Sequence, residues 1–271
     1  MICFSNIKIN LGLHIINRRN DGFHNIESLF FPVKFCDMLE IIESKKVTFT
    51  TTGIPIEGNQ NDNLVLSAYQ LLAIDYALPP VDIHLHKIIP MGAGLGGGSS
   101  NAAFMIKLLN STFDLQLSVV QMETYASKLG SDCPFFIQNK PSYLLGKGHE
   151  LAPIELDLSP YYLVLCYANV HSNTALAYSK VKCRENLIES ESIKHWINQP
   201  VSQWKNNVFN DFEDSVFNKF PILATIKNEL YQQGALYVSM SGSGSAVYGL
   251  FAQKPQLTEQ LRPLVCFEAW L

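Results

Sequence analysis

The segment that most constrains this chain is a glycine-rich stretch, PMGAGLGGGSSNAAF, at residues 90–104. Five glycines fall among the seven positions 92–98, shortly before a mostly apolar run at 105–109. Glycine costs roughly 0.5–1 kcal/mol relative to alanine in ordered backbone, and turns rarely need more than one or two such residues. We therefore expect residues 90–100, the glycine loop, to bring bare backbone close to a ligand before a helix over about 99–110.

Three kinds of phosphate-binding loop compete for this segment. A P-loop ends in lysine followed by serine or threonine, whereas this loop ends GSS without a lysine. The dinucleotide fingerprint G-x-G-x-x-G matches residues 92–97, but the preceding strand alternates with polar residues and the following helix leads to a second helix. In the third kind, main-chain N–H groups and the positive end of a helix hold a triphosphate. We favour the third kind, in which Ser99 and Ser100 add hydroxyls for phosphate or Mg²⁺.

Composition excludes several other classes of protein. The 271 residues suggest two domains or one large one, and a hydrophobic fraction of 47% with 16% charged residues argues against disorder. The net charge is −4 and no basic tract exceeds two residues, which argues against a nucleic-acid surface. We find no apolar run near the ~20 residues of a membrane span and no signal-peptide pattern. Six scattered cysteines without a C-x-x-C pair indicate a reduced, cytoplasmic protein.

Hydrophobic periodicity predicts an α+β chain in two parts, 1–153 and 154–271, with a boundary near 153–160. A hairpin turn is expected at Asn20-Asp21-Gly22, and Asp62 is the expected cap of the first helix. Strands are predicted over 1–16, 23–35, 37–43 with 47–52 as a pair, 81–86, 134–137, 142–145, 161–166, 235–240 and 246–251. Helices are predicted over 63–76, 99–110, 118–129 and most of 174–232.

Four segments, in the same order along nearly the whole chain, resemble the GHMP small-molecule kinases. They are the glycine loop, KINLGL with RRNDGFH at 8–24, LGSDCPFF at 129–136, and SMSGSGSA at 239–246. The glycine loop by itself indicates only the family and does not distinguish its members. The segments with Lys8, His24 and Asp132 together resemble the members that act on a cytidine diphosphate-linked methylerythritol. Phe23, where tyrosine is usual, and Ser131, where alanine is common, depart from the pattern.

The resemblance implies a two-domain fold, with an N-terminal half like ribosomal protein S5 domain 2 and a ferredoxin-like C-terminal half. It implies ATP-dependent phosphorylation of a 2-hydroxyl group in non-mevalonate isoprenoid precursor synthesis, with Mg²⁺. Asp132 would be the general base, and Lys8 would keep it ionised and reduce charge on the transferring phosphoryl group. The alternative for this pair is an ion pair that holds a loop to a strand.

The resemblance also implies which residues bind the nucleotide. Asn63 and Lys87 would lie on the adenine side, although a lysine in such a place is more often a solvated strand end. His84 and His86 share a strand face, but no third metal ligand is evident, so we predict no protein metal site. The phosphates would be held by Pro90, Met91, Gly92, Ala93, Gly94, Leu95, Gly96, Gly97, Gly98, Ser99 and Ser100.

The acceptor side follows from the same resemblance. A cytosine ring would lie between the aromatic faces of Phe23 and Tyr178, and stacking of this kind is worth ~1–3 kcal/mol. The full predicted set is Asn10, Phe23, His24, Phe30, Thr174 and Tyr178. For Phe30 an ordinary core position is an equal alternative, and His24 could be a turn residue.

Two other functions remain open. Another GHMP kinase would act on mevalonate, homoserine or a sugar, but residues 18–24, with their cytosine-contacting role, argue against it. A nucleotide-binding sensor or dinucleotide domain would have no need of a base, so Lys8 and Asp132 argue against that. The expected partners are small molecules, and the sequence leaves the oligomeric state open.

Overall fold

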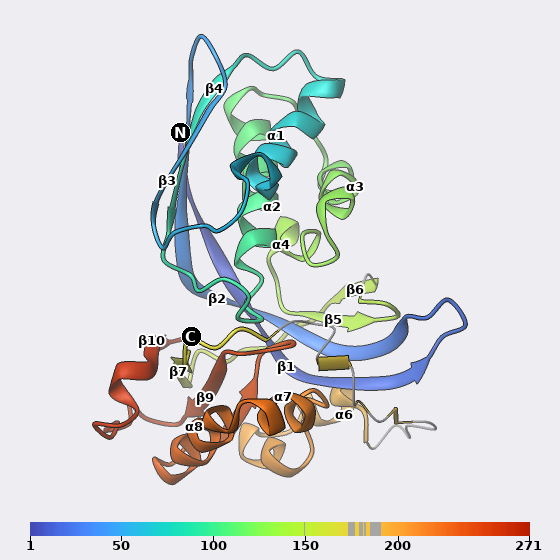
Figure 1. Ribbon diagram of the computed structural model, residues 1–271. Coiled ribbons are helices and arrows are strands. Elements are labelled where there is room, and N and C mark those ends of the chain that lie inside the picture. The colour runs from blue at the N-terminus through green and yellow to red at the C-terminus, as the bar shows by residue number, and fades with distance from the viewer. Residues whose placement is uncertain (149, 173–176, 179–180, 182, 185–190) are drawn as a thin grey trace. The chain divides into compact units, whose positions relative to one another are not determined.

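The computed structural model describes residues 1–148, 150–172, 177–178, 181, 183–184 and 191–271 (Figure 1). It contains two compact units. The first consists of Met1–Lys8, Pro32–Met91 and Gly96–Lys140, and the second of Ile9–Phe31, Gly92–Leu95 and Pro141–Leu271. Helices and strands occur in both, as the α+β prediction requires. The units alternate along the chain, whereas the predicted domains 1–153 and 154–271 are contiguous, so that division stays a prediction.

Two long strands contribute to both units: β1 (Ile2–Arg18) and β2 (His24–Glu43). They are joined by the predicted turn at residues 20–22, where Gly22 has a φ of +84°. Five apolar residues at alternate positions share one face of β1 and are buried: Ile7, Ile9, Leu11, Leu13 and Ile15. The opposite face of β1 is buried as well and carries polar side chains, namely Lys8, Asn10 and His14.

In the first unit, β4 (Val81–Lys87) pairs with the second part of β2 and with β3 (Thr48–Gly53). The β2–β4 pair is antiparallel and the β3–β4 pair is parallel. The prediction of a strand pair between 37–43 and 47–52 was therefore wrong. Segment 37–43 continues β2, and both segments use β4 as their partner. Alternation reveals a strand but not its neighbour, because pairing is decided by residues distant in sequence.

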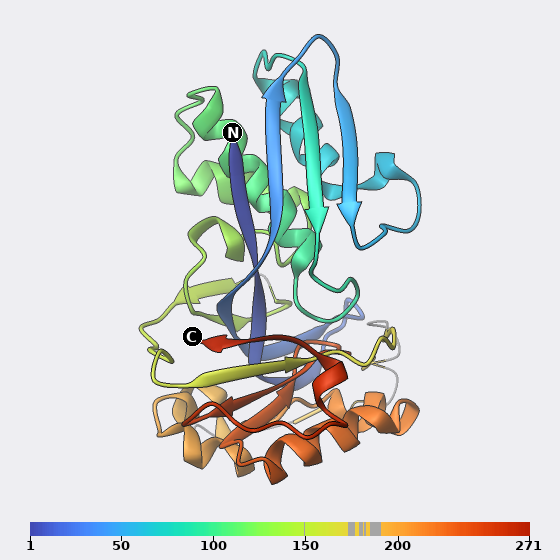
Figure 2. The same cartoon turned by 90° about the vertical axis from the view of Figure 1, so that its left-hand side faces the viewer.

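Three helices lie on one face of this sheet: α1 (Leu64–Asp75), α2 (Gly97–Thr112) and α3 (Val119–Leu129) (Figures 1 and 2). The cap of α1 is Asn63 rather than Asp62, because Asn63 Oδ1 accepts from the Val65 N–H at 3.0 Å. Asp62 belongs instead to a short 3₁₀ turn, η1 (Gln60–Asp62). Within the described residues, every helix is too short or too polar to cross a membrane.

The segment after α3 also differs from expectation. Residues 134–137 were predicted as a strand, but Phe135–Gln138 form a short helix, α4. An apolar run of this length does not distinguish a strand from one buried helical turn. Phe135 and Phe136 are both buried in that turn. The turn places residues 131–134 directly between α3 and α4.

The second unit contains a four-stranded antiparallel sheet in the order β10–β7–β9–β8. Its strands are β7 (Tyr162–Cys166), β8 (Tyr237–Met240), β9 (Val247–Phe251) and β10 (Val265–Trp270). The first part of β2 pairs with β5 (Ser142–Leu145), which pairs with β6 (Glu150–Pro153). The sequence patterns had indicated neither β6 nor β10.

Helical segments of the second unit lie in the region predicted to be mostly helical, and α8 packs on β8 and β9 (Figure 1). They are α6 (Ile193–Ile197), η3 (Val201–Asn206), α7 (Glu213–Lys219) and α8 (Pro221–Gln232). A further 3₁₀ turn, η4 (Arg262–Leu264), precedes β10.

Candidate active site

Lys8 and Asp132, which are 124 positions apart in the sequence, meet in the first unit. Lys8 Nζ lies 3.6 Å from Asp132 Oδ2. The Lys8 side chain, on β1, is 4% exposed, whereas Asp132, in the turn before α4, is 31% exposed. Burial lowers the pKa of Lys8, and the neighbouring Asp132 carboxylate opposes that effect. The pair thus combines a buried ammonium with a carboxylate that solvent and substrate can reach.

The N-terminus of α2 lies beside this pair. Gly96, its cap residue, has a φ of +70°, and a Cβ there would lie 3.2 Å from Lys8 Cγ and 3.0 Å from Phe136 Cζ. Glycine at this position therefore lets the helix start close to Lys8. Ser99 hydrogen-bonds the thiol of Cys133, the residue after Asp132, and opposes the burial that raises the pKa of Cys133 to about 11.

The first turn of α2 is suited to an anion. The helices α1 and α3 have side-chain caps, from Asn63 and Ser118, but no described side chain caps α2. Its first N–H groups and the positive end of the helix dipole are thus left to an external acceptor. Ser100 Oγ is buried and has no hydrogen-bond partner among the described residues. Both features fit the phosphates of ATP.

The middle of the glycine loop, Gly92–Leu95, belongs to the second unit and packs on the segment SMSGSGSA at 239–246. A Cβ on Gly94, whose φ is +76°, would lie 1.9 Å from Ser241 O. Ser241 Oγ donates to Gly94 O at 2.8 Å, and the Ala246 N–H donates to Ala93 O at 3.1 Å. This close approach explains why a residue without a side chain occupies position 94.

The residues predicted for the adenine side have other partners in the structure. Lys87 is 2% exposed, and its Nζ lies 2.5 Å from Asp37 Oδ2. The alternative of a solvated strand end was therefore wrong. Asn63 caps α1. The role of these two residues in binding adenine stays a prediction, and the buried ion pair leaves the Lys87 side chain turned to Asp37.

The acceptor-side residues that the structure describes all lie in the second unit. Phe23 is 61% exposed, with Lys147 Nζ 4.8 Å from the centre of its ring. The rings of His24 and Tyr178 stack, with centroids 4.9 Å apart and planes at 23°. Burial and the charge of Arg18 lower the pKa of His24.

Two further members of this set are buried, and one lies outside the described residues. Asn10 Nδ2 donates to Ser28 Oγ at 2.8 Å, and the Asn10 N–H donates to Ser241 Oγ at 3.2 Å. Phe30 is 3% exposed, as expected of a core residue. Thr174 lies outside the residues that the structure describes.

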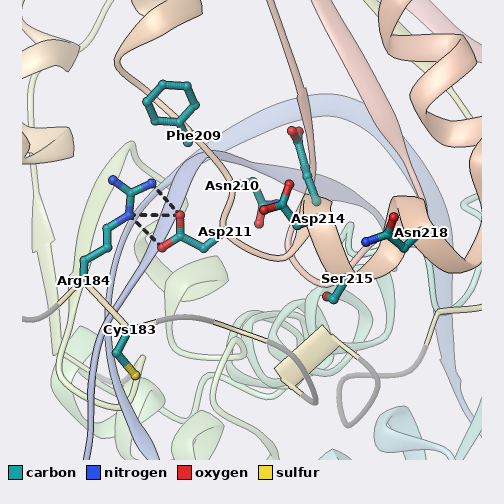
Figure 3. Close-up of a pocket in the computed structure, with 9 residues that line it drawn as sticks. Cys183, Arg184, Phe209, Asn210, Asp211, Asp214, Ser215 and Asn218 are labelled. Carbon is teal, nitrogen blue, oxygen red and sulfur yellow. Dashed lines mark hydrogen bonds and ion pairs between the residues drawn. The ribbon is translucent and has the colours of Figure 1, made fainter.

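The second unit also contains a pocket of about 570 Å³ beside α7 (Figure 3). Arg184 and Asp211 both line it and form a two-pronged ion pair, with Arg184 Nη2 2.6 Å from Asp211 Oδ1. Its described lining includes none of the residues predicted for the site. Among the described residues, no group of three His, Cys, Asp or Glu side chains is arranged to hold a metal ion.

Sequence reasoning missed two residues, one beside the glycine loop and one packed against it. Asp37 is fully buried beside the start of the loop, where it accepts from the Ile89 N–H, and its signal was an acid in a mostly apolar part of β2. The His171 ring occupies the space that a side chain at position 92 would need, since a Cβ on Gly92 would lie 2.4 Å from His171 Nδ1. No local pattern indicated this long-range contact.

This chain is similar to known kinases over most of its length. Residues 63–140 match the GHMP kinases N terminal domain, and residues 196–265 match the GHMP kinases C terminal domain. A 4-diphosphocytidyl-2-C-methyl-D-erythritol kinase from Azobacteroides pseudotrichonymphae is 52% identical over 255 residues, 94% of each chain. One of the same name from Parabacteroides distasonis is 48% identical over 267 residues, covering 98% of this chain and 97% of its own.

Solved structures match over similar lengths. A crystal structure of 4-(cytidine 5'-diphospho)-2C-methyl-D-erythritol kinase superposes with a TM-score of 0.78 and 28% identity, covering 92% of this chain and 90% of its own. A homoserine kinase from Cytophaga hutchinsonii shares the fold, with a TM-score of 0.65 and 17% identity over 92% and 86% of the two chains. The predicted two-domain GHMP kinase fold is confirmed, and the chain belongs to the GHMP kinases.

Proposed function

We propose that this chain is an ATP-dependent kinase that phosphorylates the 2-hydroxyl of 4-diphosphocytidyl-2-C-methyl-D-erythritol. The reaction belongs to non-mevalonate isoprenoid precursor synthesis. The names of the relatives at 48–52% identity support the substrate. The observation that carries the chemistry is the Lys8–Asp132 pair beside the uncapped start of α2. We place the enzyme in the cytoplasm, since all six cysteines are free.

Phosphoryl transfer depends on positioning and charge neutralisation more than on covalent help. In the proposed reaction the acceptor oxygen attacks the γ-phosphorus, its proton passes to the Asp132 carboxylate, and ADP leaves. The Lys8 ammonium lies 3.6 Å from that carboxylate as its counter-charge, and Gly96 packs closely against the Lys8 side chain. The partial exposure of Asp132 lets a hydroxyl reach it, which a general base requires.

The nucleotide phosphates would be held by the glycine loop and the start of α2. Main-chain N–H groups of residues 92–100 supply donors, and the helix dipole favours negative charge there. Mg²⁺, when bound with ATP, would neutralise phosphate charge, and such sites usually use few protein ligands. The hydroxyls of Ser99 and Ser100 fit that role, since Ser100 Oγ lacks a partner among the described residues.

The acceptor would bind through its cytosine ring and its alcohol. The face of Tyr178 already stacks on a planar ring, that of His24. We propose that Phe23 and Tyr178 stack on cytosine, that His24 contacts the edge of the base, and that Asn10, Phe30 and Thr174 complete the site. Phenylalanine at position 23 retains the aromatic face that stacking needs.

A coupled assay of ADP release tests the proposal. The purified enzyme is given Mg²⁺–ATP with the cytidyl substrate, mevalonate, homoserine or galactose in parallel. We expect turnover with the cytidyl substrate and a new phosphate monoester at its 2-hydroxyl, seen by ³¹P NMR. Comparable or faster turnover with one of the other three alcohols would overturn the substrate. ATP binding without turnover of any alcohol would favour a non-catalytic nucleotide-binding protein.

A further inference from the structure

A buried aspartate holds the main chain where it enters the glycine loop. Asp37 lies in the part of β2 that pairs with β4, and its side chain is 0% exposed. Its Oδ1 accepts from the Ile88 N–H at 2.8 Å and from the Ile89 N–H at 3.0 Å. These residues directly precede Pro90, the first residue of the loop. The two hydrogen bonds therefore fix the direction in which the chain leaves β4.

The second oxygen of the same carboxylate holds the other end of the loop. Asp37 Oδ2 accepts from Asn101 Nδ2 at 3.0 Å. Asn101 follows Ser100 in the second turn of α2 and also donates to Ser5 Oγ on β1 at 2.7 Å. One buried side chain thus joins the entry of the glycine loop, the helix at its exit and, through Asn101, strand β1.

The charge of Asp37 is balanced by Lys87. Lys87 Nζ lies 2.5 Å from Asp37 Oδ2 and 3.3 Å from Asn101 Oδ1. A Cβ on Gly97 would lie 3.4 Å from that nitrogen, so the ammonium is close to the first turn of α2. A cation is unfavourable near a helix N-terminus, and a buried charge is costly without a partner. Asp37 offsets both effects and allows the ammonium to lie there.

We propose that Asp37 is a positioning residue for the glycine loop, and that nucleotide affinity depends on it although it does not touch the nucleotide. It sets the separation and orientation of the loop's two ends, and thereby the directions of the N–H groups that bind phosphate. Lys87 acts through Asp37 rather than on adenine. This inference rests on the proposed function, because it assumes that the glycine loop binds ATP.

The test is Asp37→Asn, which keeps the size of the side chain and its Oδ1 acceptor. The new amide turns donors toward Lys87 Nζ and Asn101 Nδ2, so both contacts are lost. Affinities for Mg²⁺–ATP and, separately, for the cytidyl acceptor are measured by calorimetry. We expect ATP affinity to fall by about tenfold or more, since small misplacements of binding groups are costly, and acceptor affinity to stay unchanged.

A core variant separates positioning from general loss of stability. Leu72→Ala removes a fully buried side chain of α1, outside the glycine loop. It should lower the melting temperature while leaving ATP affinity as in the parent. Unchanged ATP affinity in Asp37→Asn, or an equal loss of affinity for both ligands, would overturn the inference. So would Lys87→Met losing more ATP affinity than Asp37→Asn, because the ammonium would then contribute to nucleotide binding beyond its effect on Asp37.

If Asp37→Asn does not fold, Asn101→Ala tests the exit end alone, and alanine keeps the helix propensity of α2. Reduced ATP affinity with normal acceptor affinity supports the inference, and parental ATP affinity overturns it. The parent protein in the same titration tests the proposed function separately. If the parent does not bind ATP, the proposed function is refuted. If the parent binds ATP and the variants bind it with the same affinity, the role of Asp37 is refuted.

Discussion

The chemistry proposed for this chain depends on an unequal pair of side chains. Lys8 is almost completely buried and Asp132 is partly exposed. A buried ammonium needs a nearby counter-charge, and Asp132 supplies one at 3.6 Å while keeping a side open to solvent. The alternative role, an ion pair that holds a loop to a strand, uses the same geometry. Substitutions that retain shape but remove charge distinguish the two.

Asp132→Asn should lower kcat by roughly 10²- to 10⁴-fold, the usual contribution of a general base. The affinity for Mg²⁺–ATP should change little, because the N–H donors of α2 remain. Steady-state kinetics and calorimetry on the same preparation measure both. Glu57→Gln, an exposed change in the first unit, is the control for loss of a negative charge. If the ion pair has only a structural role, Asp132→Asn should instead lower the melting temperature and leave kcat per folded enzyme unchanged.

Phe23 offers a second test at this scale, because its ring is 61% exposed and thus available to a ligand. Phe23→Ala should raise the KM for the cytidyl acceptor by roughly 5- to 150-fold. This range corresponds to the stacking energy of one base, ~1–3 kcal/mol. The KM for ATP should stay close to that of the parent. Phe4→Ala removes a phenylalanine that is 63% exposed in the first unit and should alter neither. Equal rises in both KM values would argue against stacking.

At the scale of elements, the glycine loop is shaped by close backbone contact as well as by its ligand. Position 94 combines a positive φ with a carbonyl oxygen where its Cβ would lie, whereas a Cβ on Gly98 would meet nothing within 4 Å. The five glycines therefore have different reasons to be there. At some of the five positions, contacts within the protein leave no space for a side chain even when no nucleotide is bound.

Gly94→Ala should consequently destabilise the protein by about 1–3 kcal/mol or more, since alanine at this φ is strained and its Cβ would overlap Ser241 O. Gly98→Ala lies inside α2 without a positive φ and should raise stability by about 0.4–1 kcal/mol. Urea denaturation of the two variants measures the difference. Similar stabilities would mean that the contact between Gly94 and Ser241 is not made in solution.

The anchoring of α6 gives a prediction about pH. Glu27, on β2, accepts from Ser192 Oγ, the cap of α6, at 2.5 Å and from the Tyr143 hydroxyl. His14 Nδ1 lies 3.3 Å from its other oxygen. Burial acts to raise the pKa of Glu27, but His14 and Ser192 outweigh it and hold the pKa below the ordinary value of 4.5. The ionised carboxylate is thus the form that the folded protein stabilises.

Because the folded-state pKa is depressed, this stabilisation is complete above pH 4.5 and is lost as the pH falls from 4.5 through the folded-state value. Glu27→Gln should cost about 1.5–3 kcal/mol at pH 7, as expected for buried hydrogen bonds to a charge. Its unfolding free energy should also depend less on pH in that acid range. Glu43→Gln, at the exposed end of the same strand, should retain the parental pH dependence. A parental profile in Glu27→Gln would contradict this account.

For the whole molecule, the sequence was informative wherever a feature is local. The strand predicted over 1–16 and the helix predicted over 118–129 correspond to β1 and α3 of the structure. The family resemblance pointed to Lys8 and Asp132 as a pair, and the structure places their side chains 3.6 Å apart. Composition alone would not have paired two residues so far apart.

What escaped prediction depends on contacts between distant segments. The shared use of β4 by β2 and β3, and the helical turn after Pro134, are decided by packing partners that no short window contains. The same holds for Asp37, whose partners lie 50 to 64 positions away. The solvated strand end considered for Lys87 was wrong for the same reason, because its buried counter-charge Asp37 is distant in the sequence.

The central claim is that the N–H groups around the start of α2 bind the phosphates while Lys8 and Asp132 converge on the acceptor alcohol. A crystal structure with a non-hydrolysable ATP analogue, Mg²⁺ and the cytidyl substrate tests it most directly. We predict the γ-phosphate at the N-terminus of α2 and the 2-hydroxyl within about 2.6–3.2 Å of the Asp132 carboxylate. Phosphates bound elsewhere, or a 2-hydroxyl out of reach of Asp132, would contradict the account.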